Sequence, residues 1–333
     1  MSAIAEGSKS ISKLLKSRTD RVHIIAPARL HLGFLDLNGG LGRLFGSIGL
    51  ALESPATELI LRRAPEDKVE GVEQKRSARA LEHFKTALRI KGNFHLDVKR
   101  AIPAHAGLGS GTQLALAVGV ALRTLENHEL SAVELGDIIG RGARSAIGMA
   151  AFEAGGFVVD GGRGKTPAPP PVLFRCDFPE AWRILLVKDT RMAGVHGERE
   201  VNAFANLEAM PPAESGRLCR LTLMQLLPAL REHDIENFGA AITEIQQIIG
   251  RQFSVAQGGG VWASRDVESI VTRMHELGAS GIGQSSWGPT GFAFVPSAGV
   301  ADRLYESLLD DATRRGLEIE IVRGRNRGAL VEF

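Results

Sequence analysis

The chain has 333 residues, of which 44% are hydrophobic and 23% charged, and 40 basic against 38 acidic residues leave a net charge of +2. This composition is ordinary for a soluble globular protein, and the length predicts two domains. Basic residues form no dominant block, so composition gives no support to general nucleic-acid or membrane binding. Cys176 and Cys219 stand in no motif spacing, which predicts reduced structural thiols and a cytoplasmic protein.

Residues 1–20 carry basic side chains without a continuous apolar segment, which predicts a flexible N-terminal extension and neither a signal peptide nor a membrane span. The next elements predicted are strands of one antiparallel sheet, at 22–26, 30–37, 47–52 and 57–61. A helix over 76–90 precedes a strand over 93–99, in which Phe94, Leu96 and Val98 alternate with polar residues.

After that strand comes a glycine-rich turn, followed by a helix that is apolar nearly all round and therefore predicted to be buried. A shorter helix is predicted near 132–140. A first domain is predicted over 21–165, a proline-rich linker over 166–172 and a second domain over 173–333. The second domain is predicted to contain four amphipathic helices, the last at about 299–314, and strands at 182–187, 292–295 and 318–322.

The glycine-rich turn, PAHAGLGSGTQ over 103–113, is the main candidate site. Its glycines permit a tight turn that lies close to a ligand, and Ser110 and Thr112 are predicted N-caps of the helix. The start of that helix offers free N–H groups and a positive dipole end, which suit a phosphate or pyrophosphate. The alternative is a strand-to-helix turn whose glycines serve packing alone.

Three loops of small residues, at 29–40, 105–113 and 284–291, each lie beside a predicted strand end. Such loops suit an anionic, phosphorylated small molecule with magnesium. The sequence contains neither the phosphate-loop pattern Gly-x-x-x-x-Gly-Lys-Ser/Thr nor Gly-x-Gly-x-x-Gly, and it lacks the usual zinc motifs. Among the residues that these loops carry are Arg29, His31, Asp36, His105, Ser110, Thr112, Ser286 and Thr290.

The segment PARLHLG over 27–33, the turn at 103–113 and the late glycine-rich loop resemble the GHMP small-molecule kinases in order and spacing. The resemblance covers nearly the whole chain after residue 21. It implies an α+β fold, with an N-terminal ribosomal-protein-S5-domain-2-like α/β domain, a C-terminal ferredoxin-like α+β domain and the ligand between them. Two departures from the kinase pattern bear on activity: Gly148 stands where the kinases commonly have a catalytic Asp, and SSWGPT over 285–290 replaces a run of glycines and alanines.

Within the central kinase motif, Pro-x-x-x-Gly-Leu-x-Ser-Ser-Ala-Ala, the chain matches at Pro103, Gly107, Leu108 and Ser110 and departs at Gly111, Thr112 and Gln113. The departing segments resemble the β-ribofuranosylaminobenzene 5'-phosphate synthases of the same superfamily. The segments that carry this resemblance are HLGFLDLNG over 31–39, GLGSGTQ over 107–113, FEAGGFVVDGG over 152–162 and SWGPT over 286–290.

This second resemblance implies a decarboxylating pentosyltransferase on the route to tetrahydromethanopterin. Such an enzyme joins 4-aminobenzoate to phosphoribosyl pyrophosphate and releases carbon dioxide and pyrophosphate. The resemblance also implies Mg²⁺ dependence and a homodimer. 4-Hydroxybenzoate stays open as the acceptor, because it differs from 4-aminobenzoate by one polar group. Two other functions also stay open: an ATP-dependent GHMP kinase acting on an alcohol, and a non-catalytic regulator that binds a phosphorylated ligand on the same scaffold.

The residues predicted to be catalytic are Arg29, as an anion contact, His31, for orientation or proton transfer, and Asp36, for Mg²⁺ or the substrate amine. Asp36 and Glu153 are the candidate metal ligands. Structural alternatives are an ion pair for Arg29, a turn role for Asp36, and core packing for His31 and Trp287. The predicted phosphate-binding residues are His105, Gly107, Leu108, Gly109, Ser110, Gly111, Thr112 and Gln113. The predicted substrate-binding residues are Ser286, Trp287, Gly288, Pro289 and Thr290.

Overall fold

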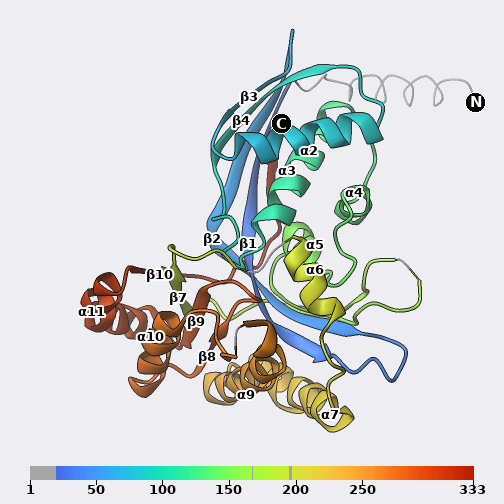
Figure 1. Ribbon diagram of the computed structural model, residues 1–333. Coiled ribbons are helices and arrows are strands. Elements are labelled where there is room, and N and C mark those ends of the chain that lie inside the picture. The colour runs from blue at the N-terminus through green and yellow to red at the C-terminus, as the bar shows by residue number, and fades with distance from the viewer. Residues whose placement is uncertain (1–19, 167, 195–196, 258) are drawn as a thin grey trace, which may run out of the picture.

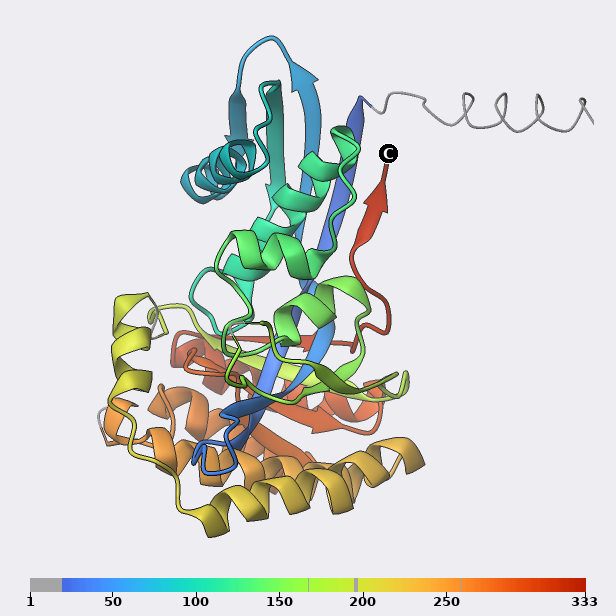
Figure 2. The ribbon, with the colours of Figure 1, turned by 90° about the vertical axis from the view of Figure 1, so that its right-hand side faces the viewer.

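The computed structural model describes residues 20–166, 168–194, 197–257 and 259–333 (Figure 1). The predicted N-terminal extension therefore lies outside the described residues, apart from Asp20. Two sheets organise the chain, and Figures 1 and 2 show one above the other with helices packed around them. Along the described parts of the chain, no helix is both long enough and apolar enough to cross a membrane.

The first sheet has seven strands in the order β11-β1-β2-β4-β3, and β5 and β6 extend it from β2. All of its strand pairs are antiparallel except β3–β4. The strands are β1 (Arg21–Asp36), β2 (Phe45–Ala64), β3 (Lys68–Gly71), β4 (Asn93–Arg100), β5 (Phe157–Asp160), β6 (Val172–Cys176) and β11 (Leu330–Glu332).

The four short strands predicted near the start of the chain are in fact two long ones, β1 and β2. Their register shifts between Pro27 and Ala28, where three residues of β2 have no partner in β1. Proline cannot donate a ladder hydrogen bond, so the strand is irregular at this point but continues beyond it. This irregularity lies just before Arg29 and His31, so the second half of β1 carries both residues toward the second sheet.

Among the described residues, four helices accompany the first sheet: α2 (Gln74–Ala87), α3 (Ser110–Leu125), α4 (Ala132–Ile138) and α5 (Ile147–Glu153). Helix α3 is buried along most of its length, as its nearly continuous apolar sequence predicts. Gly119 lets α2 approach closely, because a Cβ atom there would lie 2.6 Å from the ring of Phe84. The alternation predicted for β4 is also confirmed, since Phe94, Leu96 and Val98 are fully buried.

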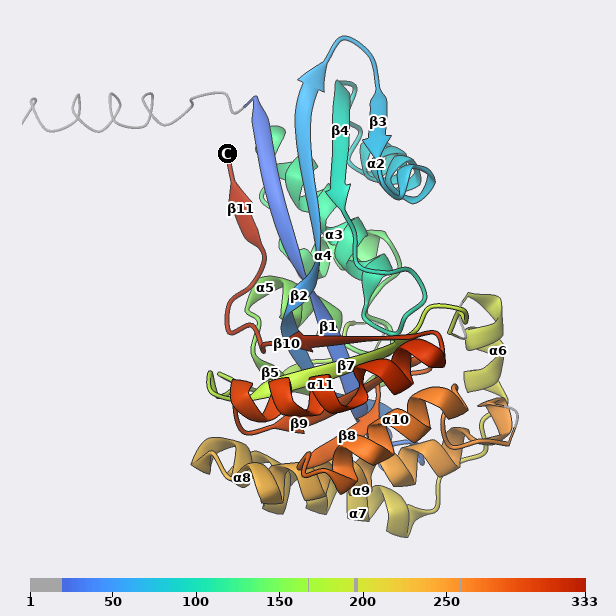
Figure 3. The same ribbon diagram turned by 90° about the vertical axis from the view of Figure 1, so that its left-hand side faces the viewer.

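The second sheet is antiparallel, in the order β10-β7-β9-β8. Figure 3 shows α10 and α11 on one side of it and α9 on the other. The strands are β7 (Arg183–Asp189), β8 (Gly281–Gln284), β9 (Thr290–Val295) and β10 (Leu317–Val322). The helices are α6 (Glu198–Ala205), α7 (Pro212–Leu221), the π-helical η1 (Thr222–Leu226), α8 (Leu227–Glu232), α9 (Ile235–Phe253), the 3-10 helix η2 (Val255–Gln257), α10 (Arg265–Glu276) and α11 (Ala298–Arg314).

One hydrophobic core joins the two sheets. It contains Leu30 and Leu32 of β1, Phe292 of β9, and Ile242 and Ile245 of α9. Strands β6 and β11, which follow the proline-rich segment in sequence, pair with β5 and β1 of the first sheet. The predicted domain boundaries stay a prediction, but the first sheet is completed by strands from both sides of that segment.

Candidate active site

The three predicted loops meet at the carbonyl oxygen of Gly107. Nη1 of Arg29 donates to this oxygen at 2.6 Å, and Oγ of Ser285 donates to it at 2.8 Å. Backbone bonds reinforce the junction, since the Arg29 amide donates to Leu108 O at 3.1 Å and the Ser286 amide donates to His31 O at 3.2 Å. Strand β1, the glycine-rich turn and the β8–β9 loop therefore form one continuous site.

Gly107 is required by this junction rather than by a ligand. Its φ is +80°, and a Cβ atom would lie 2.3 Å from the carbonyl oxygen of Ser285. Gly288 is equally close to the turn from the other side, because its Cβ would lie 2.4 Å from Ala106 O. For these two glycines, packing between the loops accounts for the residue type.

The first turn of α3 is open to an anion. The N-cap is Gly109, with φ 82° and no side-chain cap, so the prediction that Ser110 and Thr112 act as N-caps is wrong. Without a capping side chain, the backbone N–H groups of Ser110, Gly111 and Thr112 make no hydrogen bond within the described chain. Uncapped N–H groups at the positive end of a helix dipole are the usual donors to phosphate groups.

Two arginines that the sequence analysis did not single out flank this turn. Nη2 of Arg76 and Nη2 of Arg141 lie 3.3 and 3.4 Å from the point where a Cβ atom of Gly111 would stand. Arg76 also donates to Ser110 Oγ at 3.4 Å and pairs with Glu73 at 3.2 Å. The two residues come from α2 and from the loop after α4, so no local sequence signal could have associated them with the turn.

His31 is buried, with 5% of its surface exposed, and lies between the turn and the second sheet. Its amide donates to Ser285 Oγ at 3.1 Å, and its ring centroid is 4.6 Å from that of Phe34. Burial, followed by the positive charges of Arg29 and Arg144, lowers the pKa of His31 to about 3. The imidazole is therefore neutral at pH 7, and in the free protein it is suited to orienting a substrate rather than to donating a proton as imidazolium.

Asp36 lies at the far end of β1, about 20 Å from Arg29 along the strand. Its Oδ1 accepts hydrogen bonds from the amides of Asn38 and Gly39 at 2.6 and 2.9 Å and from Ser215 Oγ at 3.3 Å. Glu153, at the end of α5, instead accepts from the amide of Ala132 at 3.1 Å. The structure thus places the two candidate metal ligands in different surroundings. Across the described residues, no three His, Cys, Asp or Glu side chains form a group that could hold a metal ion.

Gly148 and Thr112 are packed against each other. A Cβ atom on Gly148 would lie 3.0 Å from Cγ2 of Thr112, and Nε2 of Gln113 donates to Gly148 O at 2.7 Å. The departures from the kinase pattern at Thr112 and Gly148 are therefore in contact, because the threonine side chain fills the space beside residue 148. No carboxylate stands at this position.

The start of helix α5, which carries Gly148, is held by Asp160, which sequence reasoning did not identify as a site residue. The Asp160 carboxylate is fully buried and accepts from the amides of Ser47, Ala146 and Gly162 at 2.8–2.9 Å. Burial raises the pKa of Asp160, and these hydrogen bonds oppose that shift. Its position as the last residue of the buried strand β5 was the sequence signal that could have found it.

The predicted substrate-binding loop is largely internal. Trp287 is 3% exposed, and its ring stacks on Phe204 at 4.8 Å and meets Phe253 at 4.8 Å. Pro289 O accepts from the amide of Asp189 at 3.1 Å, and Thr290 is fully buried at the start of β9.

Ser286 differs from these residues, because it adopts φ 56° and lines a cavity. In the glycine-rich turn, Leu108 is buried in the core, whereas His105 is exposed and its carbonyl oxygen accepts from the amide of Gly194 at 2.9 Å.

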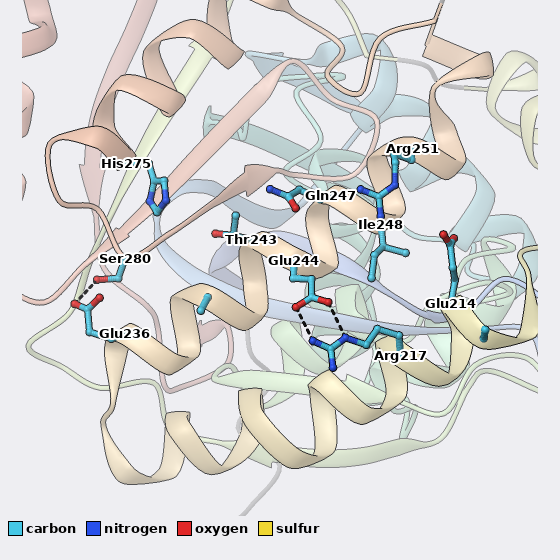
Figure 4. Close-up of a pocket in the computed structure, with 12 residues that line it drawn as sticks. Glu214, Arg217, Glu236, Thr243, Glu244, Gln247, Ile248, Arg251, His275 and Ser280 are labelled. Atoms are coloured by element: carbon cyan, nitrogen blue, oxygen red, sulfur yellow. Dashed lines mark hydrogen bonds and ion pairs between the residues drawn. The ribbon is translucent and has the colours of Figure 1, made fainter.

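The cavity beside Ser286 has a volume of about 360 Å³ and lies between β1, α9, β8 and α10. His31, Phe34, Gln246, Phe253 and Glu268 are among its lining residues. A wider groove of about 730 Å³ runs along α7 and α9 (Figure 4). The groove shares three lining residues with the cavity: Thr243, Gln247 and His275.

Residues 75–156 match the N-terminal domain of GHMP kinases, and residues 226–312 match their C-terminal domain. A β-ribofuranosylphenol 5'-phosphate synthase from Methanothermobacter thermautotrophicus is 35% identical over 337 residues, which cover 92% of this chain and 98% of that protein. The protein of the same name from Archaeoglobus fulgidus is 35% identical over 321 residues, with the same two coverages. The chain belongs to this family of synthases.

The synthase family shares its fold with the GHMP kinases. L. major mevalonate kinase, solved in complex with R-mevalonate, superposes with a TM-score of 0.68 at 17% identity, over 91% of this chain and 96% of that one. These matches confirm the predicted α+β fold class and the predicted superfamily. They also confirm the synthase resemblance, although the relatives are named for a phenol product and the prediction names an aminobenzene.

Proposed function

We propose that the chain is a decarboxylating pentosyltransferase that condenses a 4-substituted benzoate with phosphoribosyl pyrophosphate, in an early step of tetrahydromethanopterin synthesis. The observation that carries the proposal is the open first turn of α3, where three backbone N–H groups and the guanidinium groups of Arg76 and Arg141 meet. This arrangement suits the pyrophosphate of the donor, and membership of the synthase family supports the choice of donor chemistry.

In the proposed reaction, the bond between the ribose C1' and the pyrophosphate oxygen breaks, and pyrophosphate leaves with the electron pair. Donors placed around the developing charge lower the barrier, which is the role we assign to the first turn of α3 and its two arginines. The ring carbon that carries the carboxylate forms the new bond to C1'. Carbon dioxide then departs, and the electrons of the broken C–C bond restore the aromatic ring. No net proton transfer is needed.

The para substituent supports this route, because an amino or hydroxyl group pushes electron density onto the ring carbon that attacks. The relatives' name specifies the phenol, which is the product that 4-hydroxybenzoate would give. For Arg29, whose guanidinium lies beside Gly109 at the start of α3, we keep the role of contact to a substrate anion. His31, neutral and bonded through its backbone to Ser285, orients the reactants.

Magnesium dependence remains part of the proposal with one restriction. The groups around the first turn of α3 are N–H and guanidinium donors, which fit an anion rather than a metal ion. Magnesium would therefore reach this site as a complex with the pyrophosphate oxygens of the donor. A homodimer is proposed on the family resemblance alone, and sedimentation of the purified protein tests it. A cytoplasmic location is proposed on the cysteine usage.

The deciding experiment supplies phosphoribosyl pyrophosphate and Mg²⁺ with carboxyl-labelled 4-hydroxybenzoate, and separately with carboxyl-labelled 4-aminobenzoate. We expect labelled carbon dioxide and pyrophosphate in equal amounts with at least one acceptor. A parallel reaction contains ATP and candidate alcohols. ATP consumption without labelled carbon dioxide would establish a kinase instead. Ligand binding without turnover of any donor would establish a regulator.

A further inference from the structure

Resting on the proposed function, we propose that the cavity between β1, α9, β8 and α10 binds the aromatic acceptor, with its carboxylate at the His31 end. The volume of about 360 Å³ lies within the range of about 300–1,000 Å³ found for small-molecule sites. Its lining residues His31 and Ser286 belong to the loops that meet at the glycine-rich turn over 103–113, called the phosphate turn below. The rest of the lining combines aromatic and aliphatic surface with amides.

A single residue connects the cavity to the phosphate turn. Ser285 donates from Oγ to Gly107 O at 2.8 Å and accepts from the amide of His31 at 3.1 Å. His31 and Ser286 both line the cavity. Forming the C–C bond requires the ring carbon to approach C1' to about 3–3.5 Å, so the acceptor has to lie next to the bound pyrophosphate. Ser285 bonds both to His31 of the cavity and to Gly107 of the turn, so this is where we place the acceptor.

The polar wall of the cavity is fixed in orientation. Gln246 donates from Nε2 to Leu32 O at 2.8 Å and accepts at Oε1 from the amide of Gln284 at 2.7 Å. The side chain of Gln284 in turn donates to Oε1 of Gln257 at 2.9 Å. Phe253 and Ile249 supply apolar surface to the same cavity. A rigid space of this kind suits a flat ring with one polar substituent and loses little entropy when the ring binds.

Charge selects one orientation of the acceptor. Arg29 donates to Gly107 O at the same junction as Ser285, and its positive charge, with that of Arg144, acts on His31. This end of the cavity therefore favours the carboxylate that is later lost. Helix α10 contributes Glu268, whose carboxylate has no hydrogen bond or ion pair within the described part of the chain. A carboxylate there repels the acid group of the substrate but accepts a hydrogen bond from a para hydroxyl or amino group.

The aromatic cluster around Trp287 does not provide this site. One face of the indole stacks on Phe204 with an interplanar angle of 22°, and Phe253 packs against it at 64°. The residue is 3% exposed and does not line the cavity. The groove in Figure 4 meets the cavity at Thr243, Gln247 and His275, which gives the acceptor an approach from the α9 surface.

A cavity-filling variant tests the proposal. Val261 lines the cavity and is 36% exposed, so Val261→Trp fills the space without opening the core. Val255→Trp is the matched control, because Val255 is 90% exposed and lines none of the described pockets. We expect Val261→Trp to raise the KM for 4-hydroxybenzoate or 4-aminobenzoate at least tenfold and to leave the KM for phosphoribosyl pyrophosphate within twofold. The control should change neither. An unchanged acceptor KM in Val261→Trp, or an equal rise in both KM values, overturns the assignment.

A second measurement does not depend on turnover or on a folded variant. Wild-type protein is irradiated with 4-azidobenzoate in the presence of pyrophosphate, and the labelled peptides are identified by mass spectrometry. Labels within 243–262 or 282–286 that 4-hydroxybenzoate suppresses support the cavity. Labels at Phe204 or Trp287, or an absence of protected labelling, refute it. If the wild-type protein releases no labelled carbon dioxide, the proposed function fails, and the labelling pattern still decides where a benzoate binds.

Discussion

Replacing His31 by glutamine isolates the effect of a buried, uncharged histidine beside two arginines on the free energy of unfolding. The pKa of His31 falls from 6.5 to about 3 on folding, chiefly because the ring is buried. Between these two values the unfolded chain binds a proton that the folded chain does not, so the free energy of unfolding decreases as the pH falls from about 7 toward 3. pH 5 lies about 1.5 units below the ordinary histidine pKa of the unfolded chain. At 1.36 kcal/mol per unit, the free energy of unfolding is therefore about 2 kcal/mol lower at pH 5 than at pH 7.

The assay is urea unfolding of the wild-type protein and His31→Gln at pH 7 and pH 5. All other titrating groups are shared, so their contributions cancel in the double difference. Between pH 7 and pH 5, we expect the free energy of unfolding of the wild-type protein to fall by about 2 kcal/mol more than that of the variant. Equal losses, within about 0.5 kcal/mol, would refute the neutral, buried imidazole. A histidine ring signal that titrates near pH 6.5 in the folded protein would refute it independently.

Three further predictions concern the phosphate turn and the segments packed beside it. Gly107→Ala should lower the free energy of unfolding by about 1–3 kcal/mol more than Gly140→Ala, and urea unfolding measures both. Both glycines have positive φ, but of the two only Gly107 would bring a Cβ atom against a carbonyl oxygen. Arg141→Met should weaken pyrophosphate binding about tenfold, or about 1.4 kcal/mol, as measured by calorimetry. Arg79→Met, on the exposed surface of α2, should leave the affinity unchanged. Equal affinities in the two variants would contradict the role of Arg141 beside the turn. Asp160→Asn should cost about 1–3 kcal/mol of stability, because an amide cannot accept all the bonds that the carboxylate accepts; a thermal unfolding midpoint equal to that of the wild-type protein would disprove it.

The elements that the sequence predicted well are those whose pattern is local. The alternation in β4 and the continuous apolar run of α3 each encode their own burial, and the structure confirms both. The continuity of β1 through Pro27 could not be predicted, because it depends on pairing with β2. Strand β8, a four-residue stretch of GIGQ, has too little pattern to be recognised before its partner β9 is known.

The candidate site divides in the same way. The turn at 103–113 is contiguous, so the sequence alone predicts it as a phosphate site, and the family resemblance supplies the proposed reaction. Arg76 and Arg141 reach the same point from two separate segments, which only the fold brings together. Thr112 and Gly148, two departures from the kinase pattern that lie far apart in the sequence, are packed against each other in the fold.

The pairing of β11 with β1 has a consequence for how the chain folds during synthesis. Residues 330–332 bond to residues 23–25, and Nδ1 of His23 pairs with Glu332 at 2.8 Å. When β5 has been made, about 170 residues are still to come, which at about 5–20 residues per second takes roughly 10–30 s. During that time one edge of β1 presents unpaired backbone groups that favour association with other chains. A nascent chain of this protein should therefore depend on chaperones late in synthesis, after most of the first sheet has been translated.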